Sequence, residues 1–543
     1  MMTRSGITNI ALTVVAGLLT AIPLLFPNAF LVAFVAQVPY FYLLLGDRGA
    51  GRMRLASAYR WGLCYYMSYY IAIYHWFLYL YPMEFTGFSR GSALSVVLVA
   101  WFGLSLLQAS VFALIPLLFR LLCRAPLMKK HRILSPLAIA ALWIIFEWLQ
   151  TLTWAGVPWA RLSVGQYSYL PMIQSAALLG SYFISFLIVF VNGIVALAIL
   201  EKKGRGILIS TAAALLVANI GYGELVLRLS DYKKGEREMV VVAAIQGNIS
   251  SHEKWTAGSR RKSLHTYEML SREAAQRGAS LIVWPETVIP YKLLSNQESS
   301  QKVKDLAREL GVELIVGTFI SEKGAEGEEM SYNALLPIGR EGEILPYAYK
   351  KRHLVPFGEY VPMEGVIKVL IPPLAELDMY ADPVFAGDGS MLIEIDGIKI
   401  GALICFDSIY EELTRESVRD GAELLVLSTN DSWFFDSAAV YQHNGHAVMR
   451  AVESGRYLVR AANTGISSII APSGKIVAQL EPLVQGQIVA GVYPRDELTL
   501  YMWMGNVIVA LAGVGLALIP LFSVFESNRK KIRRFGGDEW KIS

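Results

Sequence analysis

The chain has 543 residues, of which 54% are hydrophobic and only 17% charged, and its mean hydropathy is +0.43. A soluble globular chain carries about 25% charged residues, so this composition excludes a wholly soluble protein and indicates that much of the chain lies in lipid. The net charge of +4 is too small to indicate a partner by itself, and we expect no nucleic acid among the partners.

Eight apolar segments are long enough to cross a bilayer, because a helix needs about 20 apolar residues to span the hydrocarbon core. Seven of them precede a long polar stretch and one follows it. The first leads directly into the second without a small-residue cleavage site, so we interpret it as a retained helix. The segments are Ile7–Phe26, Ala29–Leu45, Trp61–Tyr81, Ala93–Leu118, Leu134–Trp154, Met172–Leu200, Gly206–Leu227 and Tyr501–Val524.

Lysine and arginine residues alternate between the two ends of these segments. They are frequent after the second, fourth, sixth and eighth segments and rare in the loops between. The end of a membrane segment that is richer in lysine and arginine is usually cytoplasmic. The alternation therefore predicts that both chain ends are cytoplasmic and that the stretch between segments seven and eight lies outside.

Polar and aromatic side chains inside the membrane segments have two interpretations each. The aromatic residues of the third and fifth segments, such as Tyr65, Tyr69 and Trp148, form either a belt at the membrane interface or a lipid-binding face. We favour the belt for residues near the segment ends. Glu147 is a carboxylate within an apolar segment, where it is costly, and it is either a functional group or a structural lock.

The sequence changes character between Glu238 and Arg495, where short β-branched runs alternate with polar helical stretches, as is typical of a layered α/β domain. The expected strands are 239–246, 280–284, 313–319, 332–338, 391–395, 398–406, 423–429, 457–462, 467–471 and 487–492. The expected helices are 259–277, 299–310, 410–420 and 440–454. The predicted division is a seven-helix membrane domain at 1–230, the α/β domain at 238–495, an eighth membrane helix at 501–524 and a basic tail at 525–543.

Three segments of the α/β domain carry side chains suited to nucleophilic catalysis. Glu286 follows an apolar strand that Pro285 ends, and Cys405 lies at the end of another buried strand. Lys351 lies in a basic cluster between them. Active groups gather beyond the carboxyl ends of strands in open α/β sheets. Taken alone, each residue has a simpler interpretation: a turn carboxylate, a solvated basic patch and a core thiol.

The remaining cysteines indicate neither a metal site nor a disulfide framework. Cys64 and Cys123 lie in apolar runs and are interpreted as small buried hydrophobic side chains. The sequence has no Cys-x-x-Cys pair and no Cys/His cluster, so we expect no zinc site. Cys405 is therefore expected to be a free thiol, and a free thiol is often present because its reactivity is used.

Together, these segments resemble the three signatures of the nitrilase superfamily: WPET at Trp284–Thr287, KRHLVPFGE at Lys351–Glu359 and ICFD at Ile404–Asp407. With QGN at Gln246–Asn248 and STNDSWF at Ser428–Phe434, the second signature is similar to one branch, the apolipoprotein N-acyltransferases. That family has seven membrane helices, a nitrilase-like domain on the periplasmic side and an eighth helix. The resemblance therefore implies an αββα sandwich joined to a membrane helix bundle in a bacterial inner membrane.

The resemblance also implies a mechanism and two substrates. Cys405 would be the nucleophile, Glu286 the general base and acid, and Lys351 the group that stabilises the oxyanion. The acyl donor would be a phospholipid, typically phosphatidylethanolamine, and the acceptor would be the α-amino group of the diacylglyceryl-cysteine of an apolipoprotein. Both substrates are anchored in the lipid bilayer. No metal and no cofactor is implied.

Six more residues are implied as supporting or substrate-binding groups. One is a glutamate that the family needs near its site, and one resembles a family tryptophan whose simpler interpretation is packing. Two depart from the family's pattern, because phenylalanine and aspartate follow the nucleophile where tyrosine and glutamate usually stand. The last two belong to STNDSWF, of which Asn430 and Asp431 are expected to shape the pocket floor. The six are Glu359, Trp255, Phe406, Asp407, Asn430 and Trp433.

A lid and two other functions complete the expectations. The apolar stretch Val366–Pro373 lies in an expected irregular loop, which is either a lipid gate, the favoured interpretation, or a loop packed permanently on the membrane helices. The alternatives to an acyltransferase are a membrane-tethered carbon–nitrogen hydrolase (amidase) and a non-catalytic partner module of another membrane enzyme. A hydrolase of small solutes would not need eight spans. The presence of Glu286, Lys351 and Cys405 together argues against a non-catalytic module.

Overall fold

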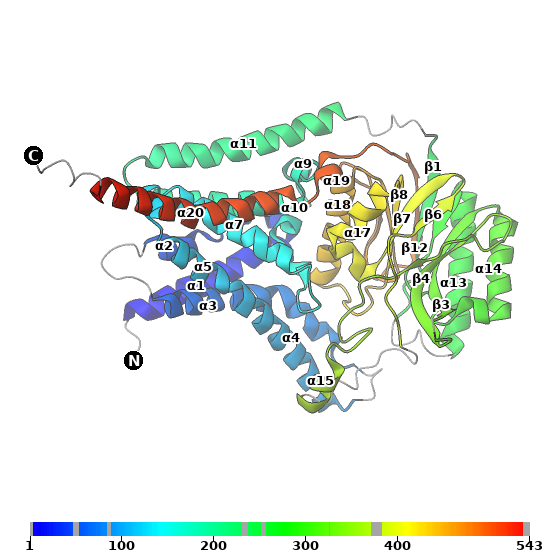
Figure 1. The fold of residues 1–543 in the computed structure, drawn as a ribbon. Coiled ribbons are helices and arrows are strands. Elements are labelled where there is room, and N and C mark those ends of the chain that lie inside the picture. Colours follow the sequence, from blue (N-terminus) through cyan, green and yellow to red (C-terminus); the bar gives the residue numbers. More distant parts are fainter. Residues whose placement is uncertain are drawn as a thin grey trace, which may run out of the picture.

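The computed structural model describes residues 4–46, 54–83, 88–230, 237–250, 257–324, 326–370 and 383–535. A bundle of helices is joined to a domain of two sheets, and α1 begins and α20 ends at the same end of the bundle, far from the sheets (Figure 1). The helices before the sheets are α1 (Arg4–Leu25), η1 (Pro27–Phe34), α2 (Val38–Gly46), α3 (Leu55–Ile73), η2 (Tyr74–Leu80), α4 (Arg90–Phe112), α5 (Leu114–Leu122), α6 (Pro126–Lys130), α7 (Leu134–Leu149), η4 (Pro158–Ala160), η5 (Leu162–Gln166), α8 (Leu170–Ile173), α9 (Ala176–Leu179), α10 (Ser181–Leu200) and α11 (Arg205–Leu229). Those after the sheets are α19 (Leu500–Met504) and α20 (Val507–Phe535).

Within the described residues, five helical segments are long and apolar enough to cross a membrane: Ile7–Leu25, Pro27–Gly46, Arg90–Leu122, Ser181–Leu200 and Arg205–Leu229. Three shorter apolar helices accompany them, at Leu134–Leu149, Leu170–Leu179 and Val507–Ser523. Helices of this length and composition indicate a membrane protein. The count of eight spans stays a prediction.

One expected span is wrong as a single helix. Residues 172–200 divide into the end of α8, α9 and α10, and Gly180, with φ +77°, makes the break between α9 and α10. A Cβ atom at this position would lie 2.5 Å from the ring of Tyr501, so the turn needs glycine for both its backbone and its space. Hydropathy alone does not register such a break.

The tyrosines of α3 are buried inside the bundle and do not form an interface belt. Tyr65, Tyr66, Tyr69 and Tyr70 are at most 1% exposed. The ring of Tyr65 stacks on Tyr40 with centroids 4.4 Å apart, which is the spacing of offset aromatic pairs. Both the belt and the lipid-facing interpretation are therefore wrong for these residues.

Glu147 of α7 is a structural link inside the bundle. Its Oε1 accepts hydrogen bonds from the indole N–H of Trp143 at 3.0 Å and from the backbone N–H of Leu162 at 3.1 Å. These bonds tie α7 to η5 and satisfy part of a carboxylate that is 2% exposed. The contacts support the structural lock over a functional role.

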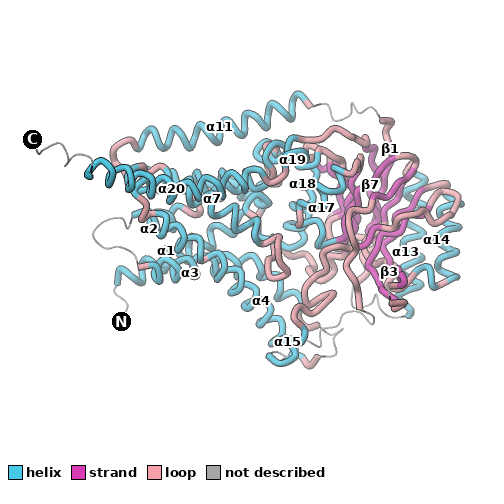
Figure 2. Tube along the Cα trace, in the orientation of Figure 1, coloured by secondary structure: helices cyan, strands magenta, loops and turns pink. Residues whose placement is uncertain are grey.

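The α/β domain consists of two six-stranded sheets, ordered β12-β1-β2-β3-β4-β5 and β11-β10-β9-β8-β7-β6. The two sheets pack against each other, with α13 and α14 on the outer side and α17 and α18 between the second sheet and the bundle (Figure 2). This arrangement confirms the αββα sandwich. Its strands are β1 (Val240–Gln246), β2 (Leu281–Val283), β3 (Glu313–Lys323), β4 (Glu329–Ile338), β5 (Tyr349–Lys350), β6 (Leu392–Ile395), β7 (Ile398–Ile404), β8 (Leu424–Thr429), β9 (Leu458–Ala462), β10 (Ser467–Ile470), β11 (Ile476–Leu480) and β12 (Gly486–Val492). Its helices are α13 (Ala257–Gln276), η6 (Leu293–Ser295), α14 (Gln297–Leu310), α15 (Glu364–Leu370), η7 (Cys405–Ile409), α17 (Glu411–Arg419) and α18 (Ala438–Ser454).

Three features of this domain differ from expectation. The short edge strands β5 and β11 lacked a sequence pattern strong enough to predict them, and β7 ends at Ile404, one residue before Cys405. The expected irregular loop contains a helix, α15, whose Ile367 packs against Met83 and Val97 near α4. Of the stretch Val366–Pro373, the last three residues lie outside the described part of the chain.

The domain is docked on the bundle through one continuous apolar core. Leu403 and Phe406, which flank the end of β7, belong to the same buried cluster as Val448 of α18 and Tyr65 of α3. Burial of so much apolar surface between the two parts is favourable by about 25 cal/mol per Å². The sheets are therefore held against the membrane bundle as one packed unit.

A buried cluster of charges lies at the same junction, and we refer to Arg161, Glu411, Arg450 and Glu453 as the junction cluster. Arg161 of the bundle donates from Nη2 to Glu411 Oε2 at 2.9 Å, and Arg450 Nη2 lies 2.7 Å from Glu453 Oε2. Each of the four side chains is at most 1% exposed. The positive charges of the two arginines are thus neutralised by the two glutamates, and all four groups are shielded from water.

Candidate active site

Strand ends from both sheets of the sandwich bring the expected reactive residues together. Strand β7 pairs in parallel with β8, with Ile404 opposite Ser428. The Ser428 hydroxyl of this sheet donates to the carbonyl of Trp284 in the other sheet at 2.9 Å. Glu286 therefore approaches the ends of β7 and β8, and its Oε2 accepts the backbone N–H of Asn430 at 3.0 Å.

A lysine between two glutamates forms the centre of the site. Lys351 Nζ lies 3.0 Å from Glu286 Oε1 and 2.9 Å from Glu359 Oε2. The amide of Asn333 donates to both carboxylates, at 2.8 Å to Glu286 and at 3.1 Å to Glu359. All three charged groups are at most 9% exposed. The ammonium is thus held charged and in one place by two buried carboxylates.

Cys405 is a free thiol at the turn from β7 into η7, where its backbone adopts φ +50°. Such a conformation is unfavourable for a residue with a side chain and is most often found at functional sites. Burial raises the pKa of this thiol well above its usual value, the Glu286 carboxylate raises it further and the Lys351 ammonium lowers it. The thiol is therefore protonated at neutral pH and needs a base before it can attack.

Asp407 is completely buried and links the turn of Cys405 to the segment of Lys351. Its carboxylate accepts hydrogen bonds from the backbone N–H of His353 at 2.8 Å and of Ile404 at 3.1 Å, and from the hydroxyl of Tyr349 at 2.9 Å. Burial raises the pKa of Asp407 to about 6, and the donors lower it. Through these bonds Asp407 ties the Cys405 turn to the backbone of the Lys351 segment.

Phe406 lines a cavity of about 320 Å³ between the bundle and the domain. One wall comes from residues 151–154, which follow α7, and the other comes from the segment after Lys351 and from η7. The imidazole of His353 stacks on the ring of Tyr410 with centroids 3.8 Å apart. Arg352 contributes the positive charge of this wall and pairs with Glu416 at 2.5 Å. The lining of the cavity therefore combines apolar and aromatic side chains with two threonines and the Arg352 cation.

The remaining expected site residues have mixed outcomes. Asn430 contacts Glu286 through its backbone, and its side-chain oxygen accepts the amide of Asn463 at 3.1 Å. Trp433 is half-buried next to Phe434, whose ring packs on Trp76 of the bundle at 4.8 Å. Trp255 lies outside the described residues.

Sequence reasoning missed Asn333 and His443. Asn333 is a polar residue in the middle of the apolar strand β4, and that exception to the pattern was the only signal that pointed to it. His443 lies on the buried face of α18, and its position next to Cys405 depends on the tertiary fold.

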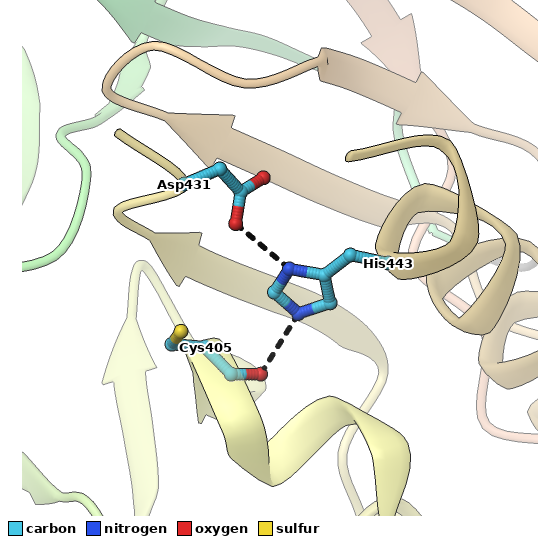
Figure 3. A group of neighbouring side chains, drawn as sticks. All are labelled: Cys405, Asp431 and His443. Atoms are coloured by element: carbon cyan, nitrogen blue, oxygen red, sulfur yellow. Dashed lines mark hydrogen bonds and ion pairs between the residues drawn. The ribbon is translucent and has the colours of Figure 1, made fainter. Parts of the chain in front are cut away.

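Cys405, His443 and Asp431 form a second group at the turn (Figure 3). Each offers one ligand atom within 4.8 Å of the others, a spacing that a metal ion could bridge. However, His443 Nδ1 bonds Asp431 Oδ1 at 2.8 Å, and Asp431 Oδ2 bonds Arg460 at 2.7 Å. Both carboxylate oxygens are engaged, so these residues act as a hydrogen-bonded chain.

Two family models match the chain. A carbon-nitrogen hydrolase model matches residues 241–496, and a model of the apolipoprotein N-acyltransferase N-terminal domain matches residues 16–194. The first match covers the two-sheet domain, which is therefore nitrilase-like. The second lies within the helix bundle, from α1 to α10.

Curated relatives extend over almost the whole chain. The apolipoprotein N-acyltransferase of Geobacter metallireducens is 33% identical over 521 residues, which cover 94% of each chain. Those of Gloeobacter violaceus and Pseudomonas aeruginosa are 31% and 30% identical, and cover 84% and 87% of this chain and 84% and 81% of their own.

Solved structures that resemble the chain cover the α/β domain. Nit3 of Saccharomyces cerevisiae, a member of branch 10 of the nitrilase superfamily, has a TM-score of 0.37 at 21% identity and covers 48% of this chain and 93% of its own. An amidase from Nesterenkonia sp. has a TM-score of 0.36 at 20% identity and covers 50% of this chain and 95% of its own.

Proposed function

Because the chain belongs to the apolipoprotein N-acyltransferase family, it is a membrane acyltransferase, and we propose that Glu286, Lys351 and Cys405 carry out the transfer. The observation that carries this proposal is the buried ammonium of Lys351 between Glu286 and Glu359, electrostatically coupled to the thiol of Cys405. This arrangement supplies a nucleophile, a base and a fixed positive charge at one place.

The first half-reaction transfers a fatty acyl group from a phospholipid, by preference phosphatidylethanolamine, to Cys405. Glu286 takes the thiol proton as the sulfur attacks the ester carbonyl carbon. The carbonyl oxygen becomes an oxyanion that the Lys351 ammonium stabilises. When the intermediate collapses, the ester C–O bond breaks and the leaving alkoxide takes the proton from Glu286. The products are an acyl thioester and a lysophospholipid.

The second half-reaction transfers the acyl group to the α-amino group of the diacylglyceryl-cysteine of an apolipoprotein. The neutral amine attacks the thioester carbonyl, and Glu286 takes a proton from the attacking nitrogen. The C–S bond then breaks, an amide forms, and the thiolate of Cys405 regains the proton from Glu286. Lys351 stays protonated throughout, since two carboxylates hold its charge.

The supporting residues hold these three side chains in position. Glu359 and Asn333 hold the ammonium and the base, and Asp407 fixes the turn that presents the thiol. The cavity beside Phe406 opens between the bundle and the domain, so we assign it to the polar part of a lipid substrate. Asn430 and Trp433 complete the proposed substrate pocket, and a supporting role for Trp255 stays a prediction from the sequence.

We also propose that eight spans place the α/β domain (238–495) on the periplasmic side of a bacterial inner membrane, with both chain ends cytoplasmic. The start of α1 and the end of α20 at one end of the bundle support an even number of crossings (Figure 1). A reporter that is active only in the periplasm should work when fused near Gly339 and fail after Lys541. Activity at both positions would disprove the even count.

The decisive experiment follows the acyl group itself. Purified protein is mixed with labelled phosphatidylethanolamine, first alone and then with a diacylated lipopeptide, and the intact protein and its Cys405 peptide are weighed by mass spectrometry. We expect a thioester on Cys405 that disappears as N-acylated lipopeptide forms, and neither product with Cys405→Ala. Release of free fatty acid without N-acylated lipopeptide would instead identify a tethered hydrolase.

A further inference from the structure

The carbonyl of Cys405 is held from two sides. The Ser408 hydroxyl donates to this carbonyl at 2.8 Å, and His443 Nε2 lies 3.1 Å from the same oxygen and 3.0 Å from the Ser408 hydroxyl. Figure 3 shows the carbonyl oxygen turned toward His443 while the sulfur points elsewhere. The turn thus carries its unusual φ of +50° with its carbonyl anchored to side chains.

His443 is itself held in one orientation. It lies on α18, is completely buried, and its Nδ1 contacts Asp431 Oδ1 at 2.8 Å. Because a carboxylate accepts, Nδ1 carries the hydrogen of this bond. Asp431 is fixed in turn by Arg460, whose charge keeps the pKa of that carboxyl well below its usual range against the effect of burial. Since the single hydrogen of the Ser408 hydroxyl goes to the Cys405 carbonyl, Nε2 binds this carbonyl only as a donor, in the form of His443 that carries hydrogens on both ring nitrogens and pairs with Asp431.

The anchored carbonyl determines the direction of the next backbone N–H. In a trans peptide the C=O and the following N–H point in opposite directions. The peptide between Cys405 and Phe406 is trans, so a carbonyl turned toward His443 directs the Phe406 N–H away from His443. A backbone N–H beside a nucleophile is well placed to bind an oxyanion.

We propose that His443, oriented by Asp431, is a positioning residue that fixes the Cys405–Phe406 peptide, so that the Phe406 N–H meets the acyl oxyanion together with Lys351. This inference rests on the proposed function. It gives two buried polar residues, outside the triad, a role in stabilising the tetrahedral intermediate. It also explains why a histidine lies on the apolar face of α18, where burial without a partner would be costly.

The test compares two reactions of the same thiol. Acylation by phosphatidylethanolamine passes through an oxyanion, whereas alkylation by iodoacetamide does not. In His443→Ala we expect single-turnover acylation to slow by about 10²-fold, the effect of misplacing a reacting group by about 1 Å. The alkylation rate and the KM for phospholipid should stay close to wild type. His443→Gln, whose amide can still donate to the carbonyl, should recover part of the acylation rate.

Two controls separate positioning from general damage. His446 lies one turn further along α18 and is equally buried, but its Nε2 contacts the Trp159 carbonyl at 3.1 Å, so His446→Ala should leave the ratio of the two rates unchanged. Ser408→Ala should lower acylation less than His443→Ala, and the double variant should lose more than either.

The positioning role of His443 and the proposed function are contradicted by different results. Wild-type acylation in His443→Ala, or a parallel loss of acylation and alkylation in both His443→Ala and His443→Gln, would overturn the positioning role. Absence of any Cys405 thioester in the wild-type protein would instead refute the proposed function.

Discussion

The protein contains two buried clusters of charge, and they differ in balance and in neighbours. The junction cluster sets two arginines against two glutamates, so its charges cancel and its members bind each other. The group of Glu286, Lys351 and Glu359 has one cation between two anions and lies against a thiol. Burial of charge therefore does not identify an active site. An excess of negative charge next to a thiol is the feature that favours the second group as the active site, because such a carboxylate could take up a proton during the reaction.

Lys351→Met should have the largest effect. It removes the charge that faces the developing oxyanion, so acylation should slow by about 10²–10³-fold, measured as thioester formation on Cys405. Lys350→Met is the matched control, because the neighbouring lysine points to Glu322 at the surface and should leave the rate unchanged. Equal rates in both variants would place the reactive charge elsewhere.

Arg161→Met should cost stability and leave the chemistry of folded molecules intact. The substitution leaves Glu411 without its closest cation. Removal of one partner from a buried ion pair lowers the free energy of unfolding by about 3–5 kcal/mol. The midpoint of thermal unfolding in detergent should fall clearly, whereas the acylation rate per folded molecule should stay at the wild-type value. Adding Glu411→Gln should recover part of the midpoint. A lowered rate per folded molecule would show that the two clusters are coupled.

The pKa of Asp407 predicts a pH dependence of stability. Since the folded state raises this pKa from its ordinary 3.8 to about 6, the folded protein binds this proton more tightly than the unfolded chain. As the pH rises from about 3 to about 7, this group should lower the free energy of unfolding by about 3 kcal/mol, most of it between pH 4 and 6, and little further change should follow above pH 7. Asp407→Asn should remove that slope. Identical slopes in variant and wild type, measured by thermal unfolding across this range, would contradict the assignment.

Arg352→Ala should have the smallest effect. Arg352 lines the cavity next to Phe406 but is partly exposed and already paired with Glu416, so its contact with a lipid phosphate is worth only about 0.5–1 kcal/mol. The KM for phosphatidylethanolamine should rise by about 2–5-fold while kcat stays the same. A changed kcat with an unchanged KM would mean that Arg352 acts on the reacting atoms.

The sandwich and the meeting of Glu286, Lys351 and Cys405 were predictable because they depend on local patterns. Glu286 and Cys405 each follow an apolar strand, β2 in one sheet and β7 in the other, and the ends of these strands lie close together where the two sheets pack. The contribution of Asn333 and of His443 was not predictable, because neither residue belongs to a local motif and each reaches the site only through the packing of β4 or α18.

The membrane bundle shows the same limit. Hydropathy predicts which segments are apolar but not which side of a helix faces lipid, so neither the interface belt nor the lipid-binding face described the tyrosines of α3, which form the interior. A single glycine at position 180 broke an expected helix without any change in average hydropathy. Both errors concern contacts between helices, which a sequence pattern along one helix does not contain.

The apolar core shared by the sheets and the bundle has a geometric consequence. Because Leu403 and Phe406 pack in the same cluster as the helices of the bundle, the thiol is held at a constant distance from those helices. Under the proposed function, a lipid would have to present its ester at that distance while its hydrocarbon tail remains beside the bundle. The proposal therefore predicts that the bond to be cleaved is selected by its distance from the membrane surface and not by the length of the acyl chain.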